Sequence, residues 1–173
     1  MASAEFIVPL DADDRLHPDF IALAMRLIAE VDIVYPDRQE FGQFERICRA
    51  GVFSLDRLKT FNRLNYCALY RRTLWCDHHY DPFVSGFDDW DFWIAAARRG
   101  ARAHHLPLPM LQHRRHASSQ MVGIRARYSE LYAKIVLNHA QVYTAAEITR
   151  AQAVLRGEAN YRSEQRLFER AYF

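Results

Sequence analysis

The sequence has few cysteines, no long apolar run and almost no excess charge. Its three cysteines, Cys48, Cys67 and Cys76, form no Cys-x-x-Cys pair, and their odd number argues against a fully paired disulfide framework. No apolar run is long enough to span a bilayer, and the first residues lack the basic and apolar regions of a signal peptide. We therefore expect a cytoplasmic protein, with at most peripheral contact with the inner membrane face.

The charge and the length set further limits. The formal net charge is only +2, which does not favour a general nucleic-acid binder. With 173 residues, half of them hydrophobic, the chain is long enough for one sizeable core and too short for two ordinary domains. It contains no internal repeat and no low-complexity tract. A single globular domain is therefore the expected organisation.

The N-terminal part contains an apolar strand, residues 6–10, that runs directly into acidic side chains. Asp11, Asp13 and Asp14 follow this strand. Open α/β sheets bind ligands at the C-terminal ends of strands, and paired Asp oxygens suit a divalent cation that carries phosphate. The alternative is an Asp-rich turn in which Asp14 caps the next helix. The segment thus indicates either a metal and phosphate site or a local helix start.

Further along the chain, the spacing of apolar residues predicts alternating helices and strands. The predicted elements are a helix over 18–30, a strand over 31–35, a short helix over 56–61, a strand over 65–70, and helices over 124–139 and 145–170. Asp37 follows the second strand, so we expect its carboxylate at a strand end beside the first acidic cluster. Two strand ends would then flank one crevice.

A second acidic cluster opens a predicted helix in the segment Gly-Phe-Asp-Asp-Trp-Asp-Phe-Trp. Asp88, Asp89 and Asp91 fall in its first turn, where the helix dipole favours negative charge, and Trp90 and Trp93 share one face. The helix is expected to pack by its tryptophans and to present its carboxylates near its N-terminal end. Alternatively, the acids are only caps and dipole partners. Their position beside two tryptophans favours a site.

Gly100 predicts the end of that helix, and residues 112–119 then bring imidazoles and guanidiniums together. His113, Arg114 and His116 could complete a metal shell or bind a diphosphate. A lone histidine is more often structural or simply exposed. The two acidic clusters upstream favour a functional role for His116.

Taken in order, the segments Leu-Asp-Ala-Asp-Asp, Tyr-Pro-Asp, Gly-Phe-Asp-Asp-Trp-Asp-Phe-Trp and Arg-Arg-His-Ala-Ser-Ser resemble the family 2 glycosyltransferases of the GT-A fold. The resemblance spans residues 6 to about 121. It implies a partial GT-A mixed sheet with flanking helices in an α/β fold. Residues 1–122 would be the metal- and acceptor-binding part, and residues 123–173 a helical C-terminal extension.

The resemblance also implies a reaction. Such enzymes transfer a sugar from a nucleotide-sugar donor, linked to UDP or GDP, to an acceptor hydroxyl with inversion, often in polysaccharide biosynthesis. The acceptor would be a saccharide or a lipid-linked molecule. Asp11 and Asp13 would form the family's Asp-x-Asp pair, with both near Mn²⁺ or Mg²⁺, Asp13 as the main ligand and Asp11 nearer the donor's ribose and phosphates.

The remaining roles come from the other two motifs. Asp89 would be the general base that deprotonates the acceptor, with Asp88 at the position of the family's Glu. His116 would be the remaining metal ligand, with Arg114 before it and Ser119 after it on the donor side. His113 is the alternative ligand.

The chain also departs from the family. Family members carry strand and helix units that hold the nucleotide base ahead of the Asp-x-Asp strand, whereas here only five residues precede it. We therefore expect this chain to be one part of a longer enzyme, without the segment that binds the nucleotide base. The missing strands would leave an exposed sheet edge, which invites pairing with another chain. The isolated chain is thus expected to be poorly soluble or oligomeric, with little transferase activity.

Three further interpretations stay open. The chain could be a non-catalytic interaction domain derived from a glycosyltransferase, with no affinity for nucleotide sugars. It could be a phosphohydrolase that uses Asp11 as a nucleophile beside Asp13, which would leave His116 unexplained. Independently, Arg162, Arg166 and Arg170 recur at helical spacing and could lie against an anionic membrane surface.

Overall fold

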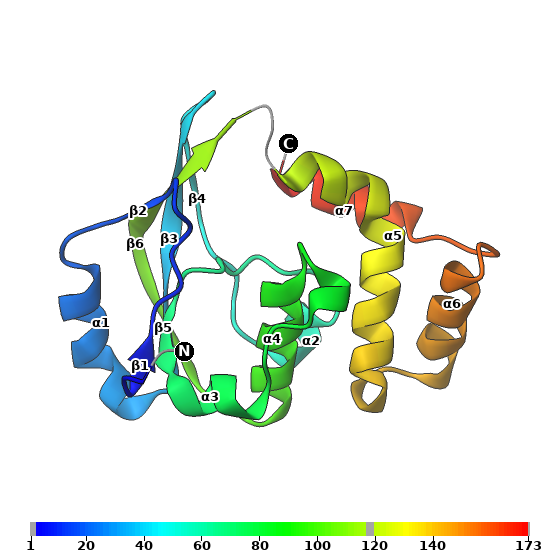
Figure 1. Ribbon diagram of the computed structural model, residues 1–173, viewed down its shortest axis with the longest axis horizontal. Helices are drawn as coiled ribbons and strands as arrows, with labels where there is room; N and C mark the ends of the chain where they lie inside the picture. Colours follow the sequence, from blue (N-terminus) through cyan, green and yellow to red (C-terminus); the bar gives the residue numbers. More distant parts are fainter. Residues whose placement is uncertain (1–2, 117–119, 173) are drawn as a thin grey trace.

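The computed structural model describes residues 3–116 and 120–172 and contains a mixed sheet with helices on both faces (Figure 1). The strand order is β1-β5-β3-β6-β2, and β4 pairs with β3. β3 and β6 are parallel, and the other pairs are antiparallel. The strands are β1 (Phe6–Ile7), β2 (Arg15–Leu16), β3 (Ile33–Gly42), β4 (Arg46–Cys48), β5 (Leu69–Arg71) and β6 (Ala103–Arg115). The predicted α/β class with a mixed sheet and flanking helices is confirmed.

The helices form layers on both sides of this sheet. Figure 1 shows α1 on one face, α2 to α4 on the other, and α5 to α7 beyond α4. Their bounds are α1 (Phe20–Leu27), α2 (Leu55–Leu58), α3 (Arg72–Asp77), α4 (Asp88–Arg98), α5 (Gln120–Asn138), α6 (Ala145–Leu155) and α7 (Arg162–Tyr172), with 3₁₀ turns at Ile28–Glu30, Pro82–Val84 and Ala140–Val142. Within the described ranges, no helix combines the length and the apolar character that crossing a membrane requires.

The pleat of the strands sends alternate side chains into two apolar layers, one on each face of the sheet. Val34 and Leu69 face α1 and pack with its buried Phe20. Their strand neighbours Ile33 and Tyr70 belong to the opposite layer, which contains both tryptophans of α4 and extends to α5, α6 and α7. The prediction that α4 packs by its tryptophans is therefore confirmed.

Two glycines with positive φ end helices. Gly100 (φ +82°) follows α4, as predicted, and its N–H donates to the carbonyl of Ala97. Gly157 (φ +78°) ends α6 in the same way, with its N–H donating to the carbonyl of Val154. Glycine adopts this left-handed conformation without the strain that a side chain adds. The prediction of one helix over 145–170 was therefore wrong, because the chain turns at Gly157 and forms two helices.

The second predicted strand is also longer than expected. β3 continues beyond residue 35 to Gly42 and pairs with β6 throughout, with a register shift on either side of Asp37. Pro36 lacks the N–H that a regular ladder requires, and strands accommodate proline at such irregularities. Asp37 accordingly lies inside the strand, and its carboxylate accepts from the Ala50 N–H (2.8 Å) and contacts His105 Nε2 (2.7 Å). The prediction that Asp37 lies at a strand end was wrong.

The C-terminal helices share a core with the rest of the chain. The boundary expected between residues 122 and 123 lies inside α5, and the buried Tyr128 and Leu131 of that helix belong to the same apolar layer as α4.

The strand β1 is two residues long and lies at the edge of the sheet, paired with β5. Cys48, Cys67 and Cys76 are all free thiols.

Candidate functional site

A cleft of about 560 Å³ lies where the acidic loop after β1, the start of α4 and the end of β6 meet. Both acidic motifs and the histidine-arginine segment contribute to its wall, although they are far apart in the sequence. The predicted site residues that line it are Asp11, Asp13, Asp88, Asp89, His113, Arg114 and His116. Ser119 lies outside the described residues. One cavity thus brings together the residues expected to bind the metal, the donor and the acceptor proton, as far as the structure describes them, whereas Asp14, Asp37 and Asp91 do not line it.

Asp13 and His116 approach each other at the mouth of this cleft. The distance from His116 Nε2 to Asp13 Oδ2 is 3.3 Å, and both side chains are nearly half exposed to solvent. Arg114, on β6, donates through Nε to the backbone carbonyl of Asp13 (3.2 Å). The end of β6 therefore holds the acidic loop in place.

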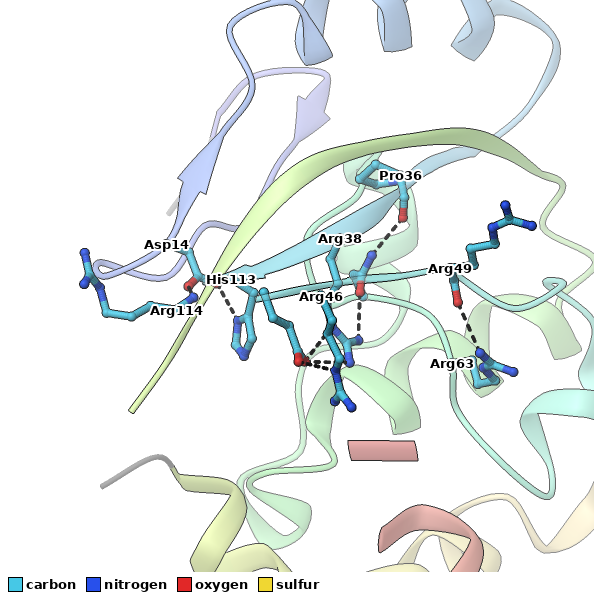
Figure 2. Close-up of polar contacts among 10 residues, drawn as sticks. Asp14, Pro36, Arg38, Arg46, Arg49, Arg63, His113 and Arg114 are labelled. Atoms are coloured by element: carbon cyan, nitrogen blue, oxygen red, sulfur yellow. Dashed lines mark hydrogen bonds and ion pairs between the residues drawn. The ribbon is translucent and has the colours of Figure 1, made fainter. Parts of the chain in front are cut away.

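Asp14 fixes the acidic loop and does not cap a helix. Its side chain is buried, and its carboxylate accepts hydrogen bonds from Tyr66 Oη (2.7 Å), His113 Nδ1 (2.8 Å) and the Arg114 backbone N–H (2.7 Å). Figure 2 shows His113 directed at Asp14. Burial alone would raise the pKa of Asp14, but these hydrogen bonds outweigh it and hold the pKa below its usual range. The capping alternative for Asp14 was wrong, because α1 begins after Asp19.

Tyr66 is a second support for this loop. Its hydroxyl donates to Asp14 and accepts a hydrogen bond from the backbone N–H of Asp11 (3.0 Å). The apolar pattern predicts a strand at Tyr66 and gives this residue no role. The apolar pattern around it offered no signal, because the contact depends on a loop more than fifty residues away.

The electrostatics of the cleft favour a cation. Burial raises the pKa of Asp11, and the negative charges of Asp14, Asp13 and Asp88 raise it further. A divalent ion near these groups would relieve that repulsion. Carboxylate oxygens suit both Mg²⁺ and Mn²⁺, and the imidazole of His116 suits Mn²⁺ better than Mg²⁺, so the donor set of Asp11, Asp13 and His116 fits Mn²⁺ best.

Asp88 and Asp89 differ in their environments although they are adjacent. Asp88 accepts from the backbone N–H of Gly86 (2.9 Å), which precedes the helix, and the N-cap residue Phe87 makes no side-chain cap to α4. Asp89 is partly buried in the cleft wall and accepts from Asn62 Nδ2 (3.3 Å) and the Trp90 N–H (2.7 Å). Desolvation, and then the charge of Asp88, raise the pKa of Asp89 to about 7. Asp89 is therefore a carboxyl group that can exchange a proton near neutral pH.

The raised pKa of Asp89 predicts a pH-dependent stability. A carboxyl group whose pKa is higher in the folded state favours folding below its unfolded pKa, near 4, and loses this contribution as the pH rises through the folded value of about 7. We expect the free energy of unfolding of the wild type to fall by about 2 kcal/mol between these pH values, relative to the Asp89→Asn protein. Urea unfolding at a series of pH values measures this difference.

The control for this experiment is Asp56→Asn. Asp56 is an exposed acid in the first turn of α2, so its replacement makes the same chemical change outside the cleft. Its unfolding free energy should follow the wild-type pH profile. Parallel profiles for the wild type and the Asp89→Asn protein would contradict a raised pKa at Asp89.

Asp91 does not join the cleft, although it lies in the same helical turn. Its carboxylate is fully buried and contacts His78 Nε2 (2.7 Å) and His139 Nε2 (3.0 Å). In the sequence, Asp91 belongs to the same acidic cluster as Asp88 and Asp89, and neither histidine has a predicted role. Helical geometry separates Asp91 from Asp89, since residues two apart point to nearly opposite sides of a helix. It does not separate Asp91 from Asp88, which lies three residues earlier on a neighbouring part of the surface.

Comparison of this chain with protein-family models and with curated proteins finds no match. What the cleft can do is therefore inferred from its own residues.

Proposed function

We propose that this chain is an inverting, metal-dependent glycosyltransferase of the GT-A type, or the metal- and acceptor-binding part of one. The observation that carries the proposal is the meeting of Asp13, Asp89 and His116 on one cleft. These residues come from three motifs that are separated in sequence. A fold that used the acids only as turn and helix caps would have no reason to bring them to a common cavity.

The proposed metal ligands are Asp13 and His116, with Asp11 beside them. Asp14 is a poor candidate because three hydrogen bonds already occupy its oxygens. His113 remains the alternative ligand: its Nδ1 faces the Asp14 carboxylate, and a contact of one ring nitrogen with a carboxylate is common among histidines that bind a metal through the other. Mn²⁺ or Mg²⁺ bound there would offset the charge of the diphosphate leaving group.

The proposed general base is Asp89. Its carboxylate takes the proton from the acceptor hydroxyl as that oxygen bonds to the anomeric carbon. The bond from this carbon to the diphosphate oxygen breaks at the opposite side, so the configuration inverts and a nucleoside diphosphate leaves. A pKa of about 7 suits this role, because the group is substantially ionised at neutral pH and is still a useful base.

The proposed metal site and the proposed base also indicate the classes of substrate. The donor is a sugar linked to UDP or GDP, whose diphosphate is an anion that a metal ion held by the acidic loop would bind. The acceptor is a saccharide or a lipid-linked molecule whose hydroxyl reaches Asp89. Asn62, which bonds to Asp89 and lines the cleft, would help to hold the base in position.

Calorimetry with UDP and GDP tests this function. We expect binding in Mn²⁺ and none in a chelator, because the diphosphate and the acidic loop repel each other without the cation. Uridine and guanosine are the controls, since they lack the diphosphate and should show no metal dependence. No nucleotide binding by the folded chain would contradict donor binding. Release of phosphate from a sugar phosphate without any acceptor would favour the phosphohydrolase interpretation.

The second candidate is a non-catalytic interaction domain, and the position of β1 favours it. This short strand lies at the sheet edge and pairs with β5. An edge strand presents backbone N–H and C=O groups to a partner strand, which would give either a homo-oligomer or a complex with another chain. An oligomer without any affinity for UDP or GDP would support this candidate.

A further inference from the structure

A second group of metal-binding side chains lies away from the cleft, where three helices meet. His78 follows α3, Asp91 belongs to α4 and His139 follows α5. One carboxylate oxygen of Asp91 contacts His78 Nε2 at 2.7 Å, and the other contacts His139 Nε2 at 3.0 Å. The potential ligand atoms of all three residues lie within 4.8 Å of one another.

This group is independent of the proposed catalytic cleft. None of its three residues lines that cavity, whereas Asp88 and Asp89 do. Asp91 follows Asp89 by two residues, a rotation of about 200° around the helix axis, so α4 separates the two sites. The inference below therefore does not rest on the proposed transferase function.

We propose that His78, Asp91 and His139 bind one Zn²⁺ ion that joins the ends of α3 and α5 to the first turn of α4. Two imidazoles and one carboxylate form a mixed nitrogen and oxygen set that Zn²⁺ accepts readily, whereas Mg²⁺ and Ca²⁺ prefer oxygen alone. Zn²⁺ bonds of about 2.0–2.1 Å place ligand atoms roughly 3.3 Å apart in a tetrahedral site. To reach this spacing, the contact of Asp91 with His139 (3.0 Å) would open by about 0.3 Å and the contact with His78 (2.7 Å) by about 0.6 Å.

The surroundings of the trio support this site. Asp91 and His139 are almost completely buried, while about a quarter of the His78 side chain is exposed, which provides a route of entry and room for a water ligand. The Asn138 amide donates to Asp91 (3.0 Å) and also to Asp81 (2.8 Å). Hydrogen bonds of this kind orient ligating carboxylates.

A missing hydrogen bond at His139 limits the affinity of the proposed site for Zn²⁺. Nδ1 of His139 is buried and has no hydrogen-bond partner among the described residues. Without metal, Nε2–H donates to Asp91 and Nδ1 carries only a lone pair. In the zinc-bound form the proton moves to Nδ1, where it lacks an acceptor, and this opposes binding. We therefore expect micromolar affinity, weaker than that of typical structural zinc sites.

Zinc titration of the chelator-treated chain tests the site, and adjacent histidines supply a matched pair of variants. His78→Gln removes a ligand at a partly exposed position, where loss of the fold is not expected. His79→Gln makes the same change at an exposed histidine that packs against Trp75. All proteins would carry Cys48→Ser and Cys76→Ser, because these accessible thiols would otherwise bind zinc.

We expect one Zn²⁺ per chain by calorimetry, and a rise in melting temperature with added Zn²⁺. His78→Gln should weaken binding by about tenfold or more and remove the rise, whereas His79→Gln should match the parent. The site should persist in an Asp13→Ala background, which excludes binding at the cleft. A folded parent that binds no Zn²⁺, or equal affinities for the two histidine variants, would overturn the proposal and leave a metal-free hydrogen-bonded cluster.

Discussion

The Asp13→Ala protein is expected to lose the Mn²⁺-dependent binding of UDP and GDP, with a drop in affinity of about a hundredfold or more. Asp13 presents a half-exposed carboxylate 3.3 Å from His116 at the cleft mouth, and it is the acid of the loop that is best placed to contact an ion. Asp14 cannot replace it, because its carboxylate holds the loop through Tyr66 and His113. Calorimetric titration of the nucleotides into the Mn²⁺-saturated protein measures the loss.

Asp19→Ala is the matched control. Asp19 is exposed before α1, makes no side-chain cap to that helix and does not line the cleft. Its replacement removes the same charge from the same part of the chain, so a general effect of net charge would appear in both variants. If Asp13→Ala bound UDP in Mn²⁺ as well as Asp19→Ala, the metal would not lie at the Asp-x-Asp pair and the proposed function would fail.

Replacement of Glu40 by Gln is expected to lower the free energy of unfolding by about 3 kcal/mol. The Glu40 carboxylate on β3 is completely buried and accepts hydrogen bonds from Arg38 (3.2 Å) and Arg46. Burial raises its pKa, but the bond from Arg46 and the charges of Arg38 and Arg115 outweigh burial and lower it. Gln keeps the shape and removes the charge, so closely spaced guanidiniums would face one another without compensation.

Glu45→Gln provides the comparison for this second variant. Glu45 is exposed in the β3–β4 turn, so its loss should change the unfolding free energy by no more than about 0.5 kcal/mol. Chemical denaturation of both proteins at neutral pH gives the difference. Equal stabilities would mean that the arginines relax into solvent and that Glu40 contributes little.

Local features of the fold were predictable from sequence, since they depend on near neighbours along the chain. The acids and tryptophans of α4 have helical spacing, and Gly100 ends the helix through its own left-handed conformation. The length of β3 was not predictable in this way. Pro36 and Asp37 resemble a strand end, but pairing with β6 carries the strand through a register shift to Gly42. Pairing with β6 therefore outweighed the tendency of Pro36 to end the strand.

Several of the aspartates expected at the site do not line the cleft. Each of them is held instead by a histidine that is distant in sequence. Asp14 bonds to His113, Asp37 to His105, and Asp91 to His139. Each of these carboxylates is buried, and each takes its hydrogen bonds inside the protein. Asp13 and Asp89 instead face the cleft.

The sequence by itself therefore determined the class of fold, the main helices and the acidic motifs, because periodicity, caps and turn residues act over a few positions. Only the tertiary structure decided which carboxylates face the cavity and which are held by distant donors. It also placed Tyr66 beneath the acidic loop and brought His78 and His139 to Asp91. The physical reason is that the role of a carboxylate depends on the donors and charges that contact it, and only the folded chain brings those groups together.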